Sequence, residues 1–175
     1  MFGAVIIIAA VFVFGKQIYM SPKYADGEKL PAFSAALING EQLELADLRG
    51  SLVFLDFWGS WCAPCRAKNK DLVRIYDKYN SAKFKEVQGF EIVSVAIDRN
   101  EQAWKKAIIR DNLHWENHIF DQATNLKFFN GAIAKEFGVK EVPSNYLLNE
   151  KGEITGVNLT MPELEKILRE RTEQL

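Results

Sequence analysis

The only two cysteines of the chain, Cys62 and Cys65, stand two residues apart in the stretch Trp61-Cys62-Ala63-Pro64-Cys65. Thiols this close can form a disulfide with each other and can exchange it with a disulfide in another molecule. One pair cannot serve as the disulfide scaffold of a chain of 175 residues, so that class of protein is excluded. The pair therefore predicts thiol–disulfide exchange, a metal site or inert packing.

The residues on either side predict how the cysteines are positioned. Residues 51–58 are apolar except for Ser51 and Asp56, which is typical of a strand covered on both faces. Helical spacing begins after Cys62 and predicts a helix over residues 63–79, with Ala67, Leu72, Ile75 and Tyr79 on one face. The cysteines are thus expected where a buried strand turns into a helix.

This position assigns different roles to the two thiols. A cysteine at the start of a helix meets unpaired backbone N–H groups and the positive end of the helix dipole, which favour the thiolate and lower the pKa of the thiol. Cys62 is therefore the predicted nucleophile. Cys65 lies about one turn further on and is the predicted resolving thiol. Pro64 suits the first helical turn, where its missing N–H costs nothing.

The remaining pattern predicts an α/β fold with a mixed sheet between helices, in one domain over residues 30–175. An Asn39-Gly40 turn indicates an opening β-hairpin. Thr160 is expected to cap the last helix, with Glu163 three residues later. The other expected elements are a hairpin over 33–38 and 41–45, strands over 90–97, 146–149 and 153–159, a short strand within 113–120, and helices over 101–110, 130–137 and 161–174.

Residues 1–20 form an apolar stretch long enough to span a bilayer, if Lys16 reaches the headgroups and Tyr19 lies at the interface. A cleaved signal peptide is disfavoured because no basic residue precedes the stretch and no good cleavage site ends it. We therefore predict an uncleaved membrane anchor at 1–20, followed by a linker at 21–29. The lysines near this stretch, Lys16, Lys23 and Lys29, all lie on its domain side, and this distribution by itself favours a cytoplasmic domain.

The sequence gives little support for metal binding or nucleic-acid binding. Together with His114 and His118, the two cysteines make up a Cys₂His₂ set. The histidine pair lies nearly fifty residues after the cysteine pair, which is too far for the zinc-finger pattern. The segment around Trp115 and the histidines is expected to be exposed or half-buried. The net charge of −1 gives no basic surface for nucleic acid. No metal and no cofactor are predicted.

Residues 56–65, Asp-Phe-Trp-Gly-Ser-Trp-Cys-Ala-Pro-Cys, resemble the active-site stretch of thioredoxins, and residues 137–144 resemble the segment that carries the family's cis-proline. The opening hairpin and the segment 104–120 are more similar to the TlpA/ResA branch of membrane-tethered thiol–disulfide oxidoreductases. The resemblance implies a cis Pro143 against the cysteine pair, with the Val142 backbone and Trp61 beside the substrate. It also implies that a buried Asp56 takes the proton from Cys65.

Three positions depart from the family pattern. The lysine that pairs with the buried acid in thioredoxins corresponds to Ser94, and two positions where ResA-like proteins often have glutamate and proline are Lys68 and Lys70. We therefore expect any acid function to depend on Asp56 alone, with a strongly shifted pKa or with water as its partner. A peroxiredoxin-like peroxidase shares the hairpin, but neither cysteine has the expected peroxidatic context.

The resulting prediction is a protein disulfide oxidoreductase. The uncharged Ala63-Pro64 pair between the cysteines favours a moderately reducing potential, and so a reductase or isomerase. Expected partners are disulfide-bearing proteins, such as apocytochrome c or other secreted proteins, and a transmembrane electron donor. The resemblance places the domain in the periplasm, anchored to the inner membrane through residues 2–20. A thioredoxin-like peptide-binding module without turnover is the main alternative.

Overall fold

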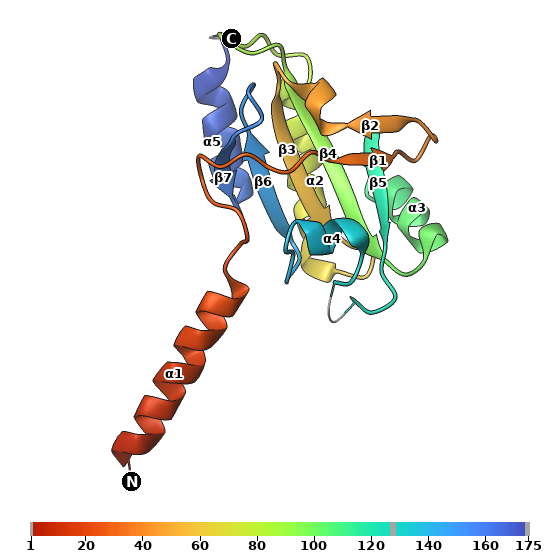
Figure 1. The fold of residues 1–175 in the computed structure, drawn as a ribbon. Coiled ribbons are helices and arrows are strands. Elements are labelled where there is room, and N and C mark those ends of the chain that lie inside the picture. Colours follow the sequence, from red (N-terminus) through yellow and green to blue (C-terminus); the bar gives the residue numbers. More distant parts are fainter. Residues whose placement is uncertain (1, 127–128, 174–175) are drawn as a thin grey trace.

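The computed structural model describes residues 2–126 and 129–173, without the side chains of residues 2–5, 8 and 9. Figure 1 shows a layered domain with one long helix projecting from it. The helices are α1 (Phe2–Met20), η1 (Leu45–Leu48, a 3-10 turn), α2 (Ala63–Tyr79), α3 (Glu101–Arg110), α4 (Ala132–Glu136) and α5 (Met161–Arg171). The strands are β1 (Ser34–Ala36), β2 (Gln42–Glu44), β3 (Leu52–Trp58), β4 (Phe90–Asp98), β5 (Asn117–Gln122), β6 (Ser144–Leu148) and β7 (Ile154–Val157).

The core of the domain is a five-stranded mixed sheet in the order β5-β4-β3-β6-β7. Strands β3, β4 and β5 run parallel, and β6 and β7 are antiparallel to their neighbours. Helices α2, α3 and α5 supply the apolar side chains on one face, while α4 and the β1–β2 hairpin cover the other (Figure 1). The predicted α/β class with a mixed central sheet is confirmed.

Strand β3 lies in the middle of the sheet, and all seven of its residues are buried. Its one acid, Asp56, pairs in register with Ser94 of β4 and Asn145 of β6. Ser94 pairs in turn with His118 of β5. Because residues in register point to the same face, these four polar residues form a row across the sheet beneath α2. We refer to Asp56, Ser94, Asn145 and His118 as the polar row.

The structure differs from the sequence-based expectations at two places near this row. The short strand expected within 113–120 is β5, which begins at Asn117 and continues past this range to Gln122, and its inward residue His118 is 2% exposed. On α2, Ala67 is exposed, and Asn69 occupies the buried face instead. The expectation of a half-buried segment is confirmed, because His114 and Glu116 are exposed while Trp115 packs against aromatic rings from α2 and β5.

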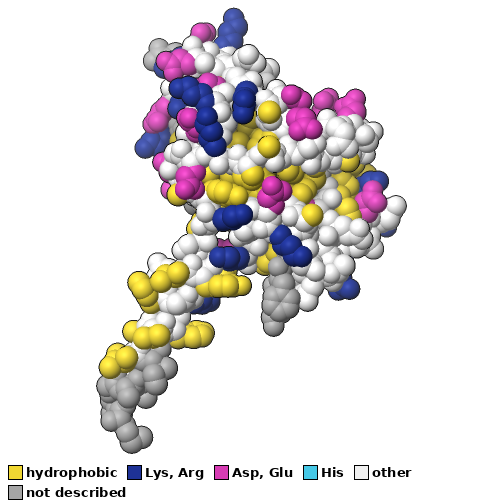
Figure 2. Space-filling view, in the orientation of Figure 1, with side chains coloured by type: hydrophobic (Ala, Val, Ile, Leu, Met, Phe, Trp, Pro, Cys, Tyr) yellow, Lys and Arg dark blue, Asp and Glu magenta, His cyan; other side chains and the backbone are white. Residues whose placement is uncertain are grey.

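The N-terminal part consists of α1 and a docked connection, residues 21–29. Most of the described large side chains of α1 are apolar and exposed, as Figure 2 shows along the projecting helix, and Lys16 and Gln17 are the polar exceptions. Over residues 2–126 and 129–173, no helix combines the length and the apolar character needed to cross a membrane. Residues 21–29 lie against the sheet edge, because the Gly27 N–H donates to Ile154 O and the Ile154 N–H donates to Glu28 O, each at 2.8 Å.

Candidate active site at the Cys62–Cys65 disulfide

Cys62 and Cys65 are joined by a disulfide at the start of α2. Cys62 is the N-cap residue, and its Sγ accepts a hydrogen bond from the Cys65 backbone N–H at 3.2 Å. Cys62 keeps a small exposed fraction of 4%, whereas Cys65 is fully buried. The sulfur atom that faces the helix N-terminus is thus also the one nearer the surface.

The turn before Cys62 is fixed by the end of β4. The Asp98 carboxylate accepts the Ser60 N–H at 2.8 Å, and the Trp61 indole N–H donates to Ile97 O at 2.9 Å. Gly59 allows this close approach, since a Cβ there would lie 2.5 Å from Trp61 Nε1. Sequence reasoning missed Asp98, although an acid that ends a buried strand beside a redox motif is a signal that could have indicated it.

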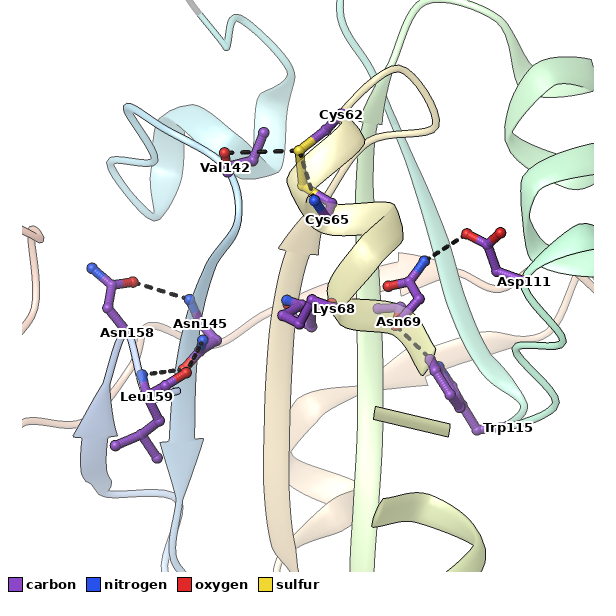
Figure 3. A network of polar contacts seen from close by, with 12 residues as sticks. Cys62, Cys65, Lys68, Asn69, Asp111, Trp115, Val142, Asn145, Asn158 and Leu159 are labelled. Carbon is purple, nitrogen blue, oxygen red and sulfur yellow. Dashed lines mark hydrogen bonds and ion pairs between the residues drawn. A yellow bond between two sulfur atoms is a disulfide. The ribbon is translucent and has the colours of Figure 1, made fainter. Parts of the chain in front are cut away.

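A second loop, which leads into β6, faces the disulfide. The Val142–Pro143 peptide bond is cis, as expected, and Cys62 Sγ lies 3.8 Å from Val142 O (Figure 3). This loop follows α4, whose first turn is held by Asp121, which accepts the N–H of Ala134 at 2.8 Å. Burial raises the pKa of the Asp121 carboxyl, although hydrogen bonds from α4 lower it.

Apolar side chains form part of the surface around the disulfide. Trp61 is 43% exposed, Ala63, Pro64 and Pro143 are exposed, and Val142 is partly exposed. Among the described residues, the Val142 N–H has no hydrogen-bond partner. An extended peptide can therefore pair with the Val142 backbone and pack on the apolar surface beside Cys62.

Beneath α2, the carboxylate of Asp56 forms an ion pair and hydrogen bond with Lys68 Nζ. Asp56 is 1% exposed and the Lys68 side chain 12%. The expectation that Asp56 acts without a cation was wrong, because Lys68 lies three residues after Cys65, about one helical turn, and points down onto the sheet. Where the resemblance places the thioredoxin lysine, this chain has Ser94, and Lys68 of α2 supplies the cation instead.

The other members of the polar row have neutral partners. Ser94 Oγ accepts the Trp115 indole N–H at 3.0 Å. The Asn145 side chain bonds the Leu159 backbone twice, at 2.8 and 3.0 Å, and the Asn145 N–H donates to Asn158 Oδ1 at 3.2 Å (Figure 3). Among the described residues, the cation paired with Asp56 is therefore Lys68.

Arg66, the residue directly after Cys65, joins α2 to the end of α3. Its guanidinium forms a two-point ion pair with Asp111, and Asn69 Nδ2 donates to the same carboxylate at 2.9 Å. Burial by itself would raise the pKa of Asp111, but the hydrogen bonds from Arg66 and Asn69 lower it below its usual value. Asp111 is therefore anionic in the folded protein.

The two histidines considered for zinc have other contacts. His114 Nε2 lies 2.7 Å from Asp77 Oδ1, and His118 stacks on Trp115 with ring centroids 5.3 Å apart. Burial lowers the pKa of His118 to about 4. Within the described parts of the chain, no three metal-ligating side chains of His, Cys, Asp or Glu come together.

Comparisons with known proteins agree with this geometry. Residues 50–154 match the family model described as thioredoxin-like. The thiol–disulfide oxidoreductase ResA of Bacillus cereus is 28% identical over 99% of this chain and 90% of its own length. The protein of the same name from Bacillus thuringiensis is 31% identical over 83% of this chain and 78% of its own.

Solved structures show the same fold. The thioredoxin domain of a thiol–disulfide oxidoreductase from Bacteroides vulgatus is 27% identical, with a TM-score of 0.71 over 85% of this chain and 98% of that one. A thiol–disulfide oxidoreductase from Bacteroides fragilis is 29% identical, with a TM-score of 0.69 over 82% and 98%. The fold, the cysteine pair and these relatives together show that the chain belongs to the thioredoxin-like family, as a ResA-type thiol–disulfide oxidoreductase.

Proposed function

We propose that this chain reduces or isomerises disulfides in other proteins, with Cys62 as the attacking thiol and Cys65 as the resolving thiol. The observation that carries the proposal is the asymmetry of the pair. Cys62 Sγ accepts the Cys65 N–H at the start of α2 and faces the Val142 loop, whereas Cys65 is enclosed. An N–H donor and the helix dipole stabilise a thiolate at Cys62.

The cycle starts from the reduced pair. The Cys62 thiolate attacks one sulfur of the substrate disulfide, forms a mixed disulfide and releases the other substrate sulfur as a thiolate. Cys65 then loses its proton and attacks Cys62 Sγ, which releases the second substrate thiolate. Two electrons have passed to the substrate, and the chain is left with the Cys62–Cys65 disulfide seen in the structure.

We assign the proton of Cys65 to Asp56. A carboxylate held below the first turns of α2 can accept this proton, and the Lys68 ammonium beside it holds the carboxylate in place. The substrate segment pairs with Val142, passes Pro143 and packs on Trp61 and Pro64. Substrates of this kind are extended segments of disulfide-bearing proteins, and apocytochrome c and other secreted proteins fit that class.

Insulin reduction tests the enzymatic proposal. With dithiothreitol as the electron source, wild-type protein should accelerate precipitation of the insulin B chain, and Cys62→Ser should abolish the acceleration. Cys65→Ser should instead accumulate a mixed disulfide that is visible by mass spectrometry. Binding of insulin without reduction by wild-type protein would support the peptide-binding module, and a mixed disulfide on Cys65 would reverse the two roles.

We further propose that α1 attaches the domain to a membrane, with the catalytic domain in the periplasm and a transmembrane thiol donor as its reductant. The exposed apolar side chains of the described part of α1 support attachment, since a large exposed apolar surface is unfavourable in water. Figure 1 shows α1 leaving the domain at the end where β3 passes into α2, so the disulfide lies toward the attached side.

Localisation needs two measurements. The full chain should remain in the membrane fraction after alkaline carbonate extraction, and a chain without residues 1–20 should be released. In intact cells, a membrane-impermeant maleimide should label Cys62 of the reduced protein if the domain lies outside the cytoplasm. Labelling only after cell lysis would place the domain in the cytoplasm, as the distribution of lysines favours.

A further inference from the structure

A hollow of about 380 Å³ lies beside the disulfide, between the start of α2 and the outer side of α3. It is lined by Ser60, Arg66, Ala103, Lys106, Ala107 and Arg110. Two of these residues belong to the active-site stretch: Ser60 stands two residues before Cys62, and Arg66 directly follows Cys65. Two residues span at most about 7 Å of chain, so the hollow adjoins the reacting sulfur.

The residues that line the hollow include three cations and no acid. Asp111 engages Arg66 with both oxygens, and Asp98 accepts the N–H groups of Ser60 and Arg99. Asp111 is paired with Arg66 and also attracts Arg110 through space, whereas Asp98 is held by neutral backbone N–H groups and keeps its charge. Lys106 and Arg110, on one side of α3 and exposed, have no ion-pair partner among the described residues. A ligand carboxylate would meet two cations there.

A substrate segment bound at Val142 can also extend to this hollow. Figure 3 shows Val142 on one side of the start of α2 and Asp111, the partner of Arg66, on the other. A segment that pairs with Val142 and presents its sulfur to Cys62 therefore continues toward the hollow. At about 3.3 Å per residue, a side chain one to three positions from the substrate cysteine reaches it.

We propose that this hollow, between Ser60 and Arg66 on one side and Lys106 and Arg110 on the other, binds an acidic side chain near the cysteine of the substrate polypeptide. It thereby selects disulfides with aspartate or glutamate beside them. The inference rests on the proposed reductase function and adds a class of substrate to it. Because the cations are exposed, their contribution is to capture the substrate, and it weakens as salt screens the charges.

The test uses three synthetic peptides of equal length, each with one internal disulfide flanked by two aspartates, two asparagines or two lysines. Reduction by the pre-reduced full-length protein in detergent is followed by separating oxidised and reduced peptide. At low salt, the aspartate peptide should be reduced about five- to tenfold faster than the lysine peptide, with the asparagine peptide between them. Salt near 1 M should remove the difference.

Charge reversal assigns the effect to the hollow. The double variant Lys106→Glu/Arg110→Glu should reverse the order of the three peptides. The matched control, Lys166→Glu/Arg169→Glu, makes the same change on exposed residues of α5 and should preserve the order. If the reversed variant does not fold, as judged by circular dichroism, Lys106→Gln/Arg110→Gln should still remove the preference.

The results distinguish failure of the acidic-substrate inference from failure of the proposed reductase function. Equal rates for the three peptides with wild-type protein, or the same loss of preference in the α5 control, would overturn the acidic-substrate inference and leave the reductase function intact. No reduction of even the asparagine peptide would instead contradict the proposed function itself.

Discussion

Asp56 and Lys68 meet below the first turns of α2, where neither side chain has much contact with water. A buried ion pair adds little net stability by itself, but losing one partner leaves a buried charge and costs about 3–5 kcal/mol. Such a pair is therefore better explained by a role in chemistry than by stability. The nearby Cys65 must lose a proton in each cycle, and Asp56 is the proposed acceptor.

We predict that Asp56→Asn slows the attack of Cys65 on the mixed disulfide by about a hundredfold, the range of general-base catalysis. The first attack by Cys62 should be nearly unchanged, because the helix N-terminus stabilises its thiolate. Stopped-flow release of thionitrobenzoate from its mixed disulfide with Cys62 measures the second step. The reaction of the disulfide dithiobis(nitrobenzoate) with reduced Cys65→Ser protein, with and without Asp56→Asn, measures the first step through the thionitrobenzoate that is released. Equal slowing of both steps would remove Asp56 from the mechanism.

Lys68 can be tested with a control on the same helix. Lys68→Met should lower the free energy of unfolding by about 3 kcal/mol, because Asp56 is left without its cation. It should also alter the pH profile of the resolution step. Lys70→Met removes an exposed lysine two residues away and should change neither quantity. If both variants behave alike in chemical denaturation, the ion pair has no energetic role.

His118 predicts a specific pH dependence of stability. Burial holds its pKa at about 4, below the ordinary 6.5, so the unfolded chain binds this proton first as the pH falls. The folded state should lose stability between pH 6.5 and about 4, by up to about 3 kcal/mol at 1.4 kcal/mol per pKa unit. His118→Phe keeps an aromatic ring against Trp115 and should flatten that part of the curve from urea titrations. Parallel curves for both proteins would contradict the prediction.

At the scale of elements, the active site depends on how the end of β4 holds the turn before α2. We predict that Gly59→Ala displaces Trp61, because the new Cβ would lie 2.5 Å from the indole nitrogen. Loss of the Trp61–Ile97 hydrogen bond should shift the tryptophan fluorescence and lower the free energy of unfolding by about 1–3 kcal/mol. Gly89→Ala is the matched control, since its Cβ would meet nothing nearer than 3.9 Å.

The elements also show what sequence alone could predict. Helices α2 and α3 have the predicted bounds because local periodicity and capping determine them. The end of β5 at Gln122 was not predicted, because its limits depend on pairing with β4. The Asp56–Lys68 pair was missed for a related reason: it depends on how α2 lies over β3, which no local pattern records. The cysteines, by contrast, were found because their chemistry is encoded in their spacing.

At the scale of the whole molecule, both edges of the sheet are covered by chain from the N-terminal third. On the β5 side, the Ile38 N–H donates to His118 O at 2.9 Å. On the β7 side, residues 27–29 pair with Glu153 and Ile154. Exposed strand edges invite pairing between molecules, so these contacts protect the sheet. The segment predicted as a linker, residues 21–29, therefore also contributes to the folded domain.

Two truncations separate the linker from the anchor. A chain that begins at Ser21 keeps the Gly27–Ile154 pairing and the packing of Tyr24 on Phe137 and Tyr146, with ring centroids 6.3 and 6.4 Å apart. Its free energy of unfolding should be that of an intact domain. A chain that begins at Leu30 loses these contacts, and we expect it to unfold more easily by about 2 kcal/mol and to self-associate through β7. Urea denaturation and analytical ultracentrifugation measure the two effects, and equal stability with no self-association would show that residues 21–29 are only a linker.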